Sequence, residues 1–140
     1  MTAGATAMEH VLVLADDIEQ AREFYCEVVG LEVGDRPALE FPGYWLYAGS
    51  VPCVHLADRA AYLAHARRLG LPVSDGLGPG AVDHIAFSGT DYDQTRALLA
   101  RRGVPAVANI VGGGGPRQVF IQDPSGVRVE INFTQATNGR

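Results

Sequence analysis

The chain has 140 residues and a net charge of −5, with 47% apolar and 19% charged residues. This length and apolar content suit one compact domain, and the lysines and arginines are too scattered for a nucleic-acid-binding surface. No apolar run is long enough to cross a bilayer, and the opening MTAGATA lacks the basic and apolar regions of a signal peptide. Two cysteines without a CxxC motif suit reduced thiols, so we expect a cytoplasmic protein.

The first half of the chain predicts a module of about residues 8–57. HVLVLA is rich in β-branched and aliphatic residues, as in a strand, and DDIEQAREFYCEVVG has apolar residues at helical spacing with a stop at Gly30. Three extended pieces follow, with a hairpin turn before the last, at Glu32–Asp35, Tyr44–Tyr47 and Pro52–Leu56.

The second half predicts the same order in a module of about residues 81–134, after a linker of about residues 58–80 that holds a short helix. DHIAFSG reads as a strand, and a helix follows from Asp91 to Arg102. Three more extended pieces are expected at Val107–Val111, Arg117–Gln122 and Val127–Phe133. The fold prediction is therefore α+β, with two tandem βαβββ modules that form a cupped mixed sheet.

The two modules are copies of one unit. His10 and His84 stand 74 positions apart, and each follows an acidic residue. A shift of 75 positions places His55 on Glu130. Two units of this size are too few for a solenoid, so a duplicated module fits better. Strand alternation then places His10, His55, His84 and Glu130 on the face opposite the helices.

Two histidines and one carboxylate suit a divalent metal with open positions. Spacing alone is a weak signal, because a single histidine on a strand is more often structural. The evidence for a metal site becomes stronger because three of the four histidines, together with Glu130, occupy equivalent strands of the repeat.

HVLVLADDIEQAREFYCEVVGLEV, DHIAF and QVFIQDPSGVRVEINF make the chain resemble the vicinal oxygen chelate superfamily, which includes glyoxalase I, extradiol dioxygenases and bleomycin-binding proteins. The resemblance runs from His10 to Phe133 and implies paired βαβββ modules around a divalent metal, the glyoxalase/dioxygenase-like fold. It implies that His10, His84 and Glu130 are the metal ligands, with Fe(II) or Mn(II) favoured and Ni(II), Co(II) or Zn(II) as alternatives. It also implies a homodimer and a small-molecule substrate.

His55 departs from the resemblance, because glyoxalase I has a carboxylate ligand at this position. Three interpretations stay open: a fourth ligand, an acid–base residue as in extradiol dioxygenases, or a polar lining residue. Phe120 stands where dioxygenases usually carry a tyrosine. Five side chains are predicted to contact substrate, and they are Tyr44, Tyr47, Arg117, Gln118 and Phe120. The glycine run VGGGGP suits a loop at the mouth of the cup or a plain hairpin turn.

Three functions follow from these residues. The first is oxygenolytic, extradiol-type chemistry on a catechol-like compound, with His55 as the proton-transfer residue. The alternative is a glyoxalase- or epimerase-type lyase or isomerase that acts through a metal-bound enediolate. The third is a protein that binds a drug or metabolite without catalysis, which ranks last because every candidate ligand is present. Whether the site forms within one chain or across a dimer stays open.

Overall fold

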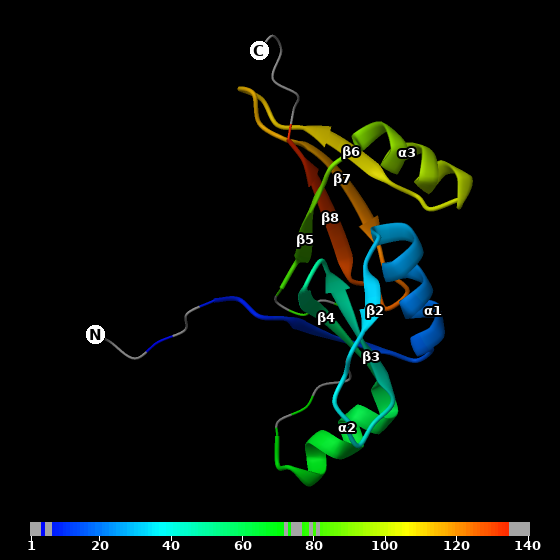
Figure 1. Cartoon of the computed structure of the whole chain (residues 1–140), viewed down its shortest axis with the longest axis vertical. Coiled ribbons are helices and arrows are strands. Elements are labelled where there is room, and N and C mark those ends of the chain that lie inside the picture. The colour runs from blue at the N-terminus through cyan, green and yellow to red at the C-terminus, as the bar shows by residue number, and fades with distance from the viewer. Residues whose placement is uncertain are drawn as a thin grey trace. The chain divides into compact units, whose positions relative to one another are not determined.

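The structure of the chain is a computed structural model that describes residues 4, 7–71, 73, 77, 78, 80 and 82–134. The chain divides into two compact units, Met1–Leu77 and Gly78–Arg140. Each unit carries a four-stranded mixed sheet and the helix that packs on it (Figure 1). The α+β prediction of two βαβββ modules is therefore confirmed. The module bounds stay a prediction, since parts of the predicted linker and most of MTAGATA and of the C-terminal TQATNGR lie outside the described residues.

The sheet of the first unit has the order β1-β4-β3-β2. Its strands are β1 (Val11–Ala15), β2 (Glu32–Gly34), β3 (Gly43–Ala48) and β4 (Val51–Asp58). β1 runs parallel to β4, and the other neighbours are antiparallel. The turn between β3 and β4 contains Gly49 at a φ of 62°, a left-handed conformation that glycine adopts without a steric penalty. The predicted hairpin at this point is confirmed.

The predicted helix of the first unit consists of two parts, α1 (Ile18–Glu23) and the π-helical turn η1 (Phe24–Val29). Asp17 begins it, because its carboxylate accepts hydrogen bonds from the backbone N–H groups of Glu19 and Gln20. The wider η1 turn places the consecutive residues Phe24 and Tyr25 both in the core, although they would point in more divergent directions from an α-helix. Apolar spacing alone did not predict this change of helix type.

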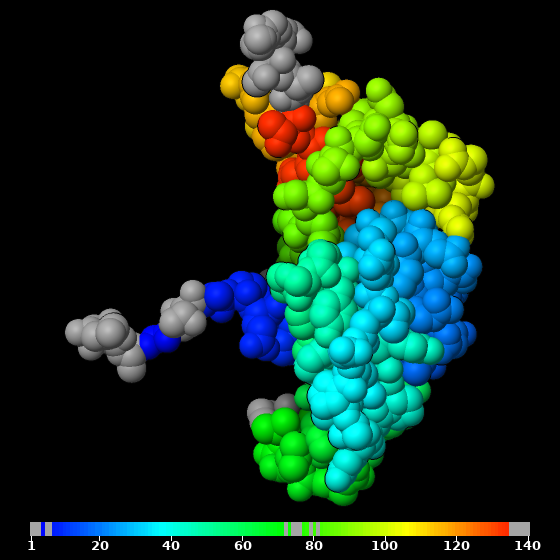
Figure 2. Space-filling view, viewed as in Figure 1, coloured from blue at the N-terminus to red at the C-terminus, as the bar shows by residue number. Residues whose placement is uncertain are grey.

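The core of the first unit lies between α1–η1 and one face of the sheet. Its fully buried members include Tyr25, Leu46, Val54 and Leu56. A further helix, α2 (Arg59–Arg68), begins at Asp58, whose carboxylate accepts a hydrogen bond from the Ala61 N–H. Only Ala66 of α2 is buried, so this helix lies at the surface of the unit (Figure 2, green). The predicted short helix in the linker is confirmed.

The second unit repeats this topology with the order β5-β8-β7-β6. Its elements are β5 (His84–Gly89), α3 (Tyr92–Arg101), β6 (Val107–Ile110), β7 (Arg117–Gln122) and β8 (Arg128–Phe133). β5 is parallel to β8, as β1 is to β4. VGGGGP closes the β6–β7 hairpin, in which the Val111 N–H donates to the Pro116 carbonyl. The structure therefore agrees with the plain hairpin interpretation of this glycine run.

Alternation along the strands gives each sheet one buried and one polar face. In β8, Val129, Ile131 and Phe133 are buried on the side of α3, while Glu130 and Asn132 occupy the other face. In β4, Val54 and Leu56 are buried on the side of α1, while His55 occupies the opposite face. Both predicted assignments of faces are confirmed. None of the helices in the described part of the chain has the length and apolar character that a bilayer crossing requires.

Candidate metal centre and its surroundings

His10 and His55 form a stacked pair on the polar face of the first sheet. His10 directly precedes β1, and His55 lies in β4 between Leu12 of β1 and Trp45 of β3. The ring centroids of His10 and His55 are 3.7 Å apart with an interplanar angle of 12°. Trp45 stacks on the other side of His55 at 4.0 Å and 11°. The imidazole of His55 is therefore fixed between two flat rings.

His55 has one ring nitrogen free of protein partners. The side chain is 8% exposed, and its buried Nε2 has no hydrogen-bond partner among the described residues. The Pro52 backbone, which can only accept, hydrogen-bonds the ring and therefore engages Nδ1. Burial, and next the neighbouring His10, lower the pKa of His55 below its ordinary value. The result is a neutral imidazole whose Nε2 lone pair is available to a ligand or a proton.

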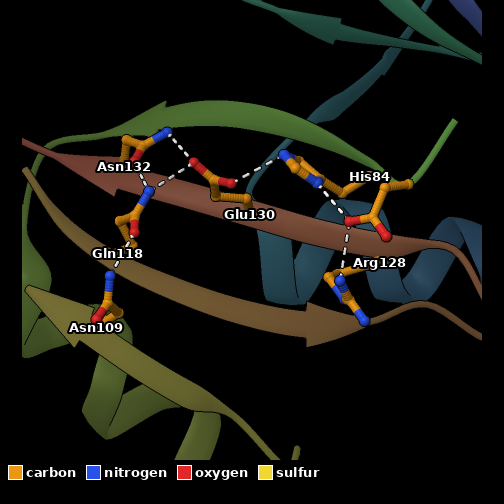
Figure 3. A network of polar contacts seen from close by, with 7 residues as sticks. His84, Asn109, Gln118, Arg128, Glu130 and Asn132 are labelled. Carbon is orange, nitrogen blue, oxygen red and sulfur yellow. Dashed lines mark hydrogen bonds and ion pairs between the residues drawn. The ribbon is translucent and has the colours of Figure 1, made fainter. Parts of the chain in front are cut away.

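His84 and Glu130 form the corresponding pair on the polar face of the second sheet (Figure 3). His84 begins β5, and Glu130 lies in the adjacent strand β8, opposite Ala86. His84 Nε2 and Glu130 Oε1 are 3.0 Å apart. Two ligands at right angles on one ion, each about 2.1 Å from it, are separated by about this distance. A neutral imidazole and a carboxylate both direct lone pairs, so a shared cation suits this pair.

A carboxylate next in sequence supports each candidate ligand histidine. Glu9 Oε1 lies 2.8 Å from His10 Nδ1, and Asp83 Oδ2 lies 2.8 Å from His84 Nδ1. Asp83 also accepts a hydrogen bond of 2.9 Å from Arg128. The His84 bond, and next the Arg128 charge, lower the pKa of Asp83. A carboxylate that accepts from Nδ1 leaves Nε2 as the ligating nitrogen, which is the arrangement that metal-binding histidines commonly have.

Two amide side chains donate to the second oxygen of Glu130, and a third amide supports one of them (Figure 3). Glu130 Oε2 accepts from Asn132 Nδ2 at 2.6 Å and from Gln118 Nε2 at 3.0 Å. Gln118 Oε1 in turn accepts from Asn109 Nδ2 at 2.8 Å. Glu130 itself is 8% exposed. The sequence-based search did not find Asn109 and Asn132, although strand alternation had placed Asn132 on the same face as Glu130.

Three of the predicted substrate-binding residues lie on the polar faces and two on the helix-covered faces. Phe120 pairs directly with Glu130, and Gln118 is two residues away on the same face. Tyr44 and Arg117 lie on the sides of α1 and α3, where Tyr44 donates to Glu19 and Arg117 lies 4.0 Å from the Tyr92 ring. Tyr47 is on the face of His55, and its hydroxyl donates to the Asp35 carbonyl.

A shallow cavity of about 290 Å³ opens beside Phe120 in the second unit. Phe120 and Arg128 share the face of Glu130 in the sheet, although Glu130 does not itself line the cavity. Its walls are mostly apolar, with the Arg128 guanidinium as the charged group. The lining residues are Pro105, Ala106, Val107, Phe120, Ile121, Gln122 and Arg128.

The hydrogen bond from Tyr44 to Glu19 makes the free energy of unfolding depend on pH. Hydrogen bonds from Tyr44, and next from Arg22, lower the pKa of Glu19 below its ordinary value of 4.5. The unfolded chain therefore takes up a proton that the folded chain does not, and stability present above pH 4.5 is lost as the pH falls through the lowered value. We expect Tyr44→Phe to reduce this loss. Urea denaturation at about pH 7 and about pH 3.5 measures the difference.

Tyr47→Phe is the matched control, because the Tyr47 hydroxyl donates to a backbone carbonyl that does not titrate. It should leave the pH dependence of the unfolding free energy unchanged. Equal pH dependence in Tyr44→Phe and the unsubstituted chain would contradict the assignment to Glu19.

The donor chemistry fits a divalent metal. Imidazole nitrogens and a carboxylate are ligands that Mn(II), Fe(II), Co(II), Ni(II) and Zn(II) accept. Each unit contributes a pair of candidate donors, and no group of three or more His, Cys, Asp or Glu side chains able to hold an ion occurs among the described residues. The buried His55 Nε2 and the 3.0 Å separation in the His84–Glu130 pair are the two observations that support the fit.

Comparison with known proteins identifies the family. Residues 7–131 match the model of the Glyoxalase/Bleomycin resistance protein/Dioxygenase superfamily. The chain is 30% identical over 129 residues to Glyoxylase I 4 of Arabidopsis thaliana, covering 90% of this chain and 70% of that protein. It is 28% identical over 151 residues to a 2-epi-5-epi-valiolone epimerase of Actinomyces sp., covering 91% and 79%.

A solved structure agrees with this assignment. The lactoylglutathione lyase of Agrobacterium tumefaciens superposes with a TM-score of 0.67 at 22% identity, covering 94% of this chain and 96% of that one. This likeness concerns the fold and confirms the predicted glyoxalase/dioxygenase-like architecture. Members of the matched superfamily generally use divalent metals, and many are enzymes. The chain belongs to the Glyoxalase/Bleomycin resistance protein/Dioxygenase superfamily.

Proposed function

We propose that the chain is a divalent-metal-dependent lyase or isomerase that moves a proton on a small α-hydroxycarbonyl substrate. His10, His84 and Glu130 are the proposed ligands, and His55 is the proposed general base. The observation that carries the proposal is the buried, unpartnered Nε2 of His55, held against the ring of His10. A base beside a ligand can reach a carbon whose oxygen the metal binds.

The stacking of the two histidines supports different roles for them. Imidazole lone pairs lie in the ring plane, and the planes of His10 and His55 are nearly parallel at 12°. Both rings therefore cannot direct a nitrogen at one ion without rotation of one of them. His10 has the Glu9 carboxylate on its Nδ1, as a ligand does, while His55 has a backbone carbonyl there.

When bound, a divalent ion would acidify the hydrogen on the hydroxyl-bearing carbon next to the substrate carbonyl. His55 Nε2 accepts that proton and returns it either to the same carbon, once the deprotonated substrate has turned its opposite face to His55, or to the neighbouring carbon. The first outcome is an epimerisation and the second is an isomerisation, and neither consumes an oxidant. The cavity beside Phe120 would hold an apolar substituent of the substrate.

The two curated relatives support proton transfer over oxygenolytic chemistry, since one is named a glyoxylase and the other an epimerase. Phe120, which pairs with Glu130, supports the same choice, because extradiol dioxygenases resemble this family but usually carry a tyrosine in that region. Ni(II), Co(II) and Zn(II) are suitable ions for lyases and isomerases of this kind. The protein is therefore tested with each of these three ions as well as with Fe(II) and Mn(II).

The test is hydrogen exchange without oxygen. Metal-loaded protein is incubated anaerobically in D₂O with the hemithioacetal of methylglyoxal and glutathione, and separately with a cyclic α-hydroxyketone, and NMR follows loss of the C–H signal. We expect metal-dependent exchange that His55→Gln abolishes while metal content is retained. Oxygen uptake with catechols, without exchange in either substrate, would favour the dioxygenase function instead. Loss of metal from His55→Gln would make His55 a ligand and overturn its role as the base.

A further inference from the structure

A row of three amides crosses the second sheet beside Glu130. Asn109 of β6, Gln118 of β7 and Asn132 of β8 are direct cross-strand partners, Asn109 with Gln118 and Gln118 with Asn132. The row, which we call the amide row, therefore lies at one level of the sheet and ends next to Glu130 (Figure 3). Neighbouring side chains on one face of a sheet are close enough to hydrogen-bond in this way.

The carboxylate fixes the direction of every amide in the row. An ionised carboxylate can only accept, so both Asn132 and Gln118 must direct their NH₂ groups at Glu130 Oε2. Gln118 Nε2 also donates to Asn132 Oδ1 at 3.2 Å. The carbonyl oxygen of Gln118 then faces Asn109, which donates to it at 2.8 Å. Every amide in the row therefore donates toward Glu130, and Gln118 and Asn132 also accept from the amide on their far side, so the hydrogen bonds form one network with a single direction.

The two oxygens of Glu130 consequently differ. Oε2 accepts two amide hydrogen bonds of 2.6 and 3.0 Å, and Oε1 faces His84 Nε2 at 3.0 Å. A carboxylate can bind a metal through one oxygen or through both. Because Oε2 already accepts two amide hydrogen bonds, an ion would bind Glu130 through Oε1, the oxygen that faces His84 Nε2.

We propose that Gln118 and Asn132 are positioning residues that restrict Glu130 to binding the metal through Oε1 alone. This inference rests on the proposed function, because it takes Glu130 to be a ligand. One-oxygen binding keeps a coordination position open, and a substrate that offers two vicinal oxygens needs two such positions. Without the amide row, Glu130 can turn and bind through both oxygens, which takes one of these positions.

The decisive variant is Gln118→Met, which keeps the length of the side chain and removes its hydrogen-bonding groups. Gln122→Met is the matched control: Gln122 lies on the same strand and the same face, but its amide donates to the Gly126 carbonyl. Both are loaded with Co(II), whose visible absorption reports coordination number, and Zn(II) affinity is measured by competition with a chelator. These readouts concern the metal alone, so the position of Gln122 at the cavity does not affect them.

We expect Gln118→Met to change the Co(II) spectrum and to weaken Zn(II) binding by about tenfold to a hundredfold, the usual effect of losing a residue that orients a ligand. Gln122→Met should match the unsubstituted chain in both measurements. Asn109→Leu provides a second variant that is less able to disturb folding, because Asn109 is exposed. It leaves Gln118 free to rotate and should produce a smaller change of the same kind.

The outcomes separate this inference from the proposed function. An unsubstituted chain that binds no divalent ion would overturn both. If the unsubstituted chain binds an ion, and Gln118→Met and Asn109→Leu have the same Co(II) spectrum and Zn(II) affinity as that chain, only the positioning role is overturned. A loss of affinity without a change of the spectrum would show that Gln118 supports Glu130 only structurally.

Discussion

Glu130→Gln should reduce divalent-metal affinity by more than about a hundredfold, because it removes a ligand rather than a residue that orients one. The substitution replaces an anionic oxygen with a neutral amide. If the new amide oxygen accepts from Gln118 and Asn132, as Glu130 Oε2 does, its NH₂ group takes the position of Oε1, where it cannot bind a cation. Metal content by elemental analysis and affinity by chelator competition measure the effect, and proton-exchange activity should fall with them.

The control for this substitution is Glu32→Gln, which removes the same charge from an exposed position on β2. It should keep the metal affinity of the unsubstituted chain. His10→Gln tests the proposal that His10 is also a ligand, and on that proposal it should weaken metal binding as well. Retention of full metal content by Glu130→Gln would remove Glu130 from the ligand set. A melting curve for each variant shows that loss of metal does not come from loss of the fold.

Gly43→Ala should lower the free energy of unfolding by about 3 kcal/mol, the upper part of the usual range for overpacking. Gly43 pairs with Ala57 between β3 and β4, and a methyl group on it would overlap the backbone carbonyl oxygen of Leu56. A backbone oxygen within a sheet cannot turn away as a flexible side chain can. The two strands must separate locally, which weakens their hydrogen bonds. Urea denaturation of the metal-free protein measures the loss.

Gly112→Ala is the matched control for Gly43→Ala. Gly112 does not have a positive φ, and a methyl group there would meet no atom within 4 Å among the described residues. Its unfolding free energy should stay within about 0.5 kcal/mol of the unsubstituted chain. Equal stability of the two variants would show that β3 and β4 can separate at Gly43 without cost. Because His55 lies next to Leu56 on β4, Gly43→Ala should also disturb the stack of His55 on His10.

The sequence predicts the topology well because local patterns determine it. The helix stop at Gly30 and the hairpin turn at Gly49 depend on nearby residues, and the structure agrees with both. The equivalence of His10 with His84 also followed from the repeat. The positions of His10 and His84 at the start of the first and fifth strands could be predicted without knowing which strands pair with each other.

Other features of the site depend on register and on faces, which the sequence does not specify. Along β3, Tyr44 and Leu46 point to one face and Trp45 and Tyr47 to the other. Both faces carry apolar or aromatic residues, so the sequence pattern could not show that Tyr44 faces α1. The amide row requires Asn109 and Gln118 to be cross-strand partners, and a slip of one residue would separate them. The stack of Trp45 on His55 depends on register in the same way.

The pairing of each ligand histidine with the residue before it has a consequence for the history of the chain. Glu9 and Asp83 each accept a hydrogen bond from the Nδ1 of the next residue, so each acid–histidine dipeptide contains both a proposed ligand and the group that sets its tautomer. Gene duplication could therefore copy a working half of the centre without any matching change elsewhere. The support of Glu130 is instead spread over three strands, and its counterpart in the first copy is His55. The two dipeptides are therefore alike in the two copies, whereas His55 and Glu130, which occupy equivalent positions, have different chemical groups and different surroundings.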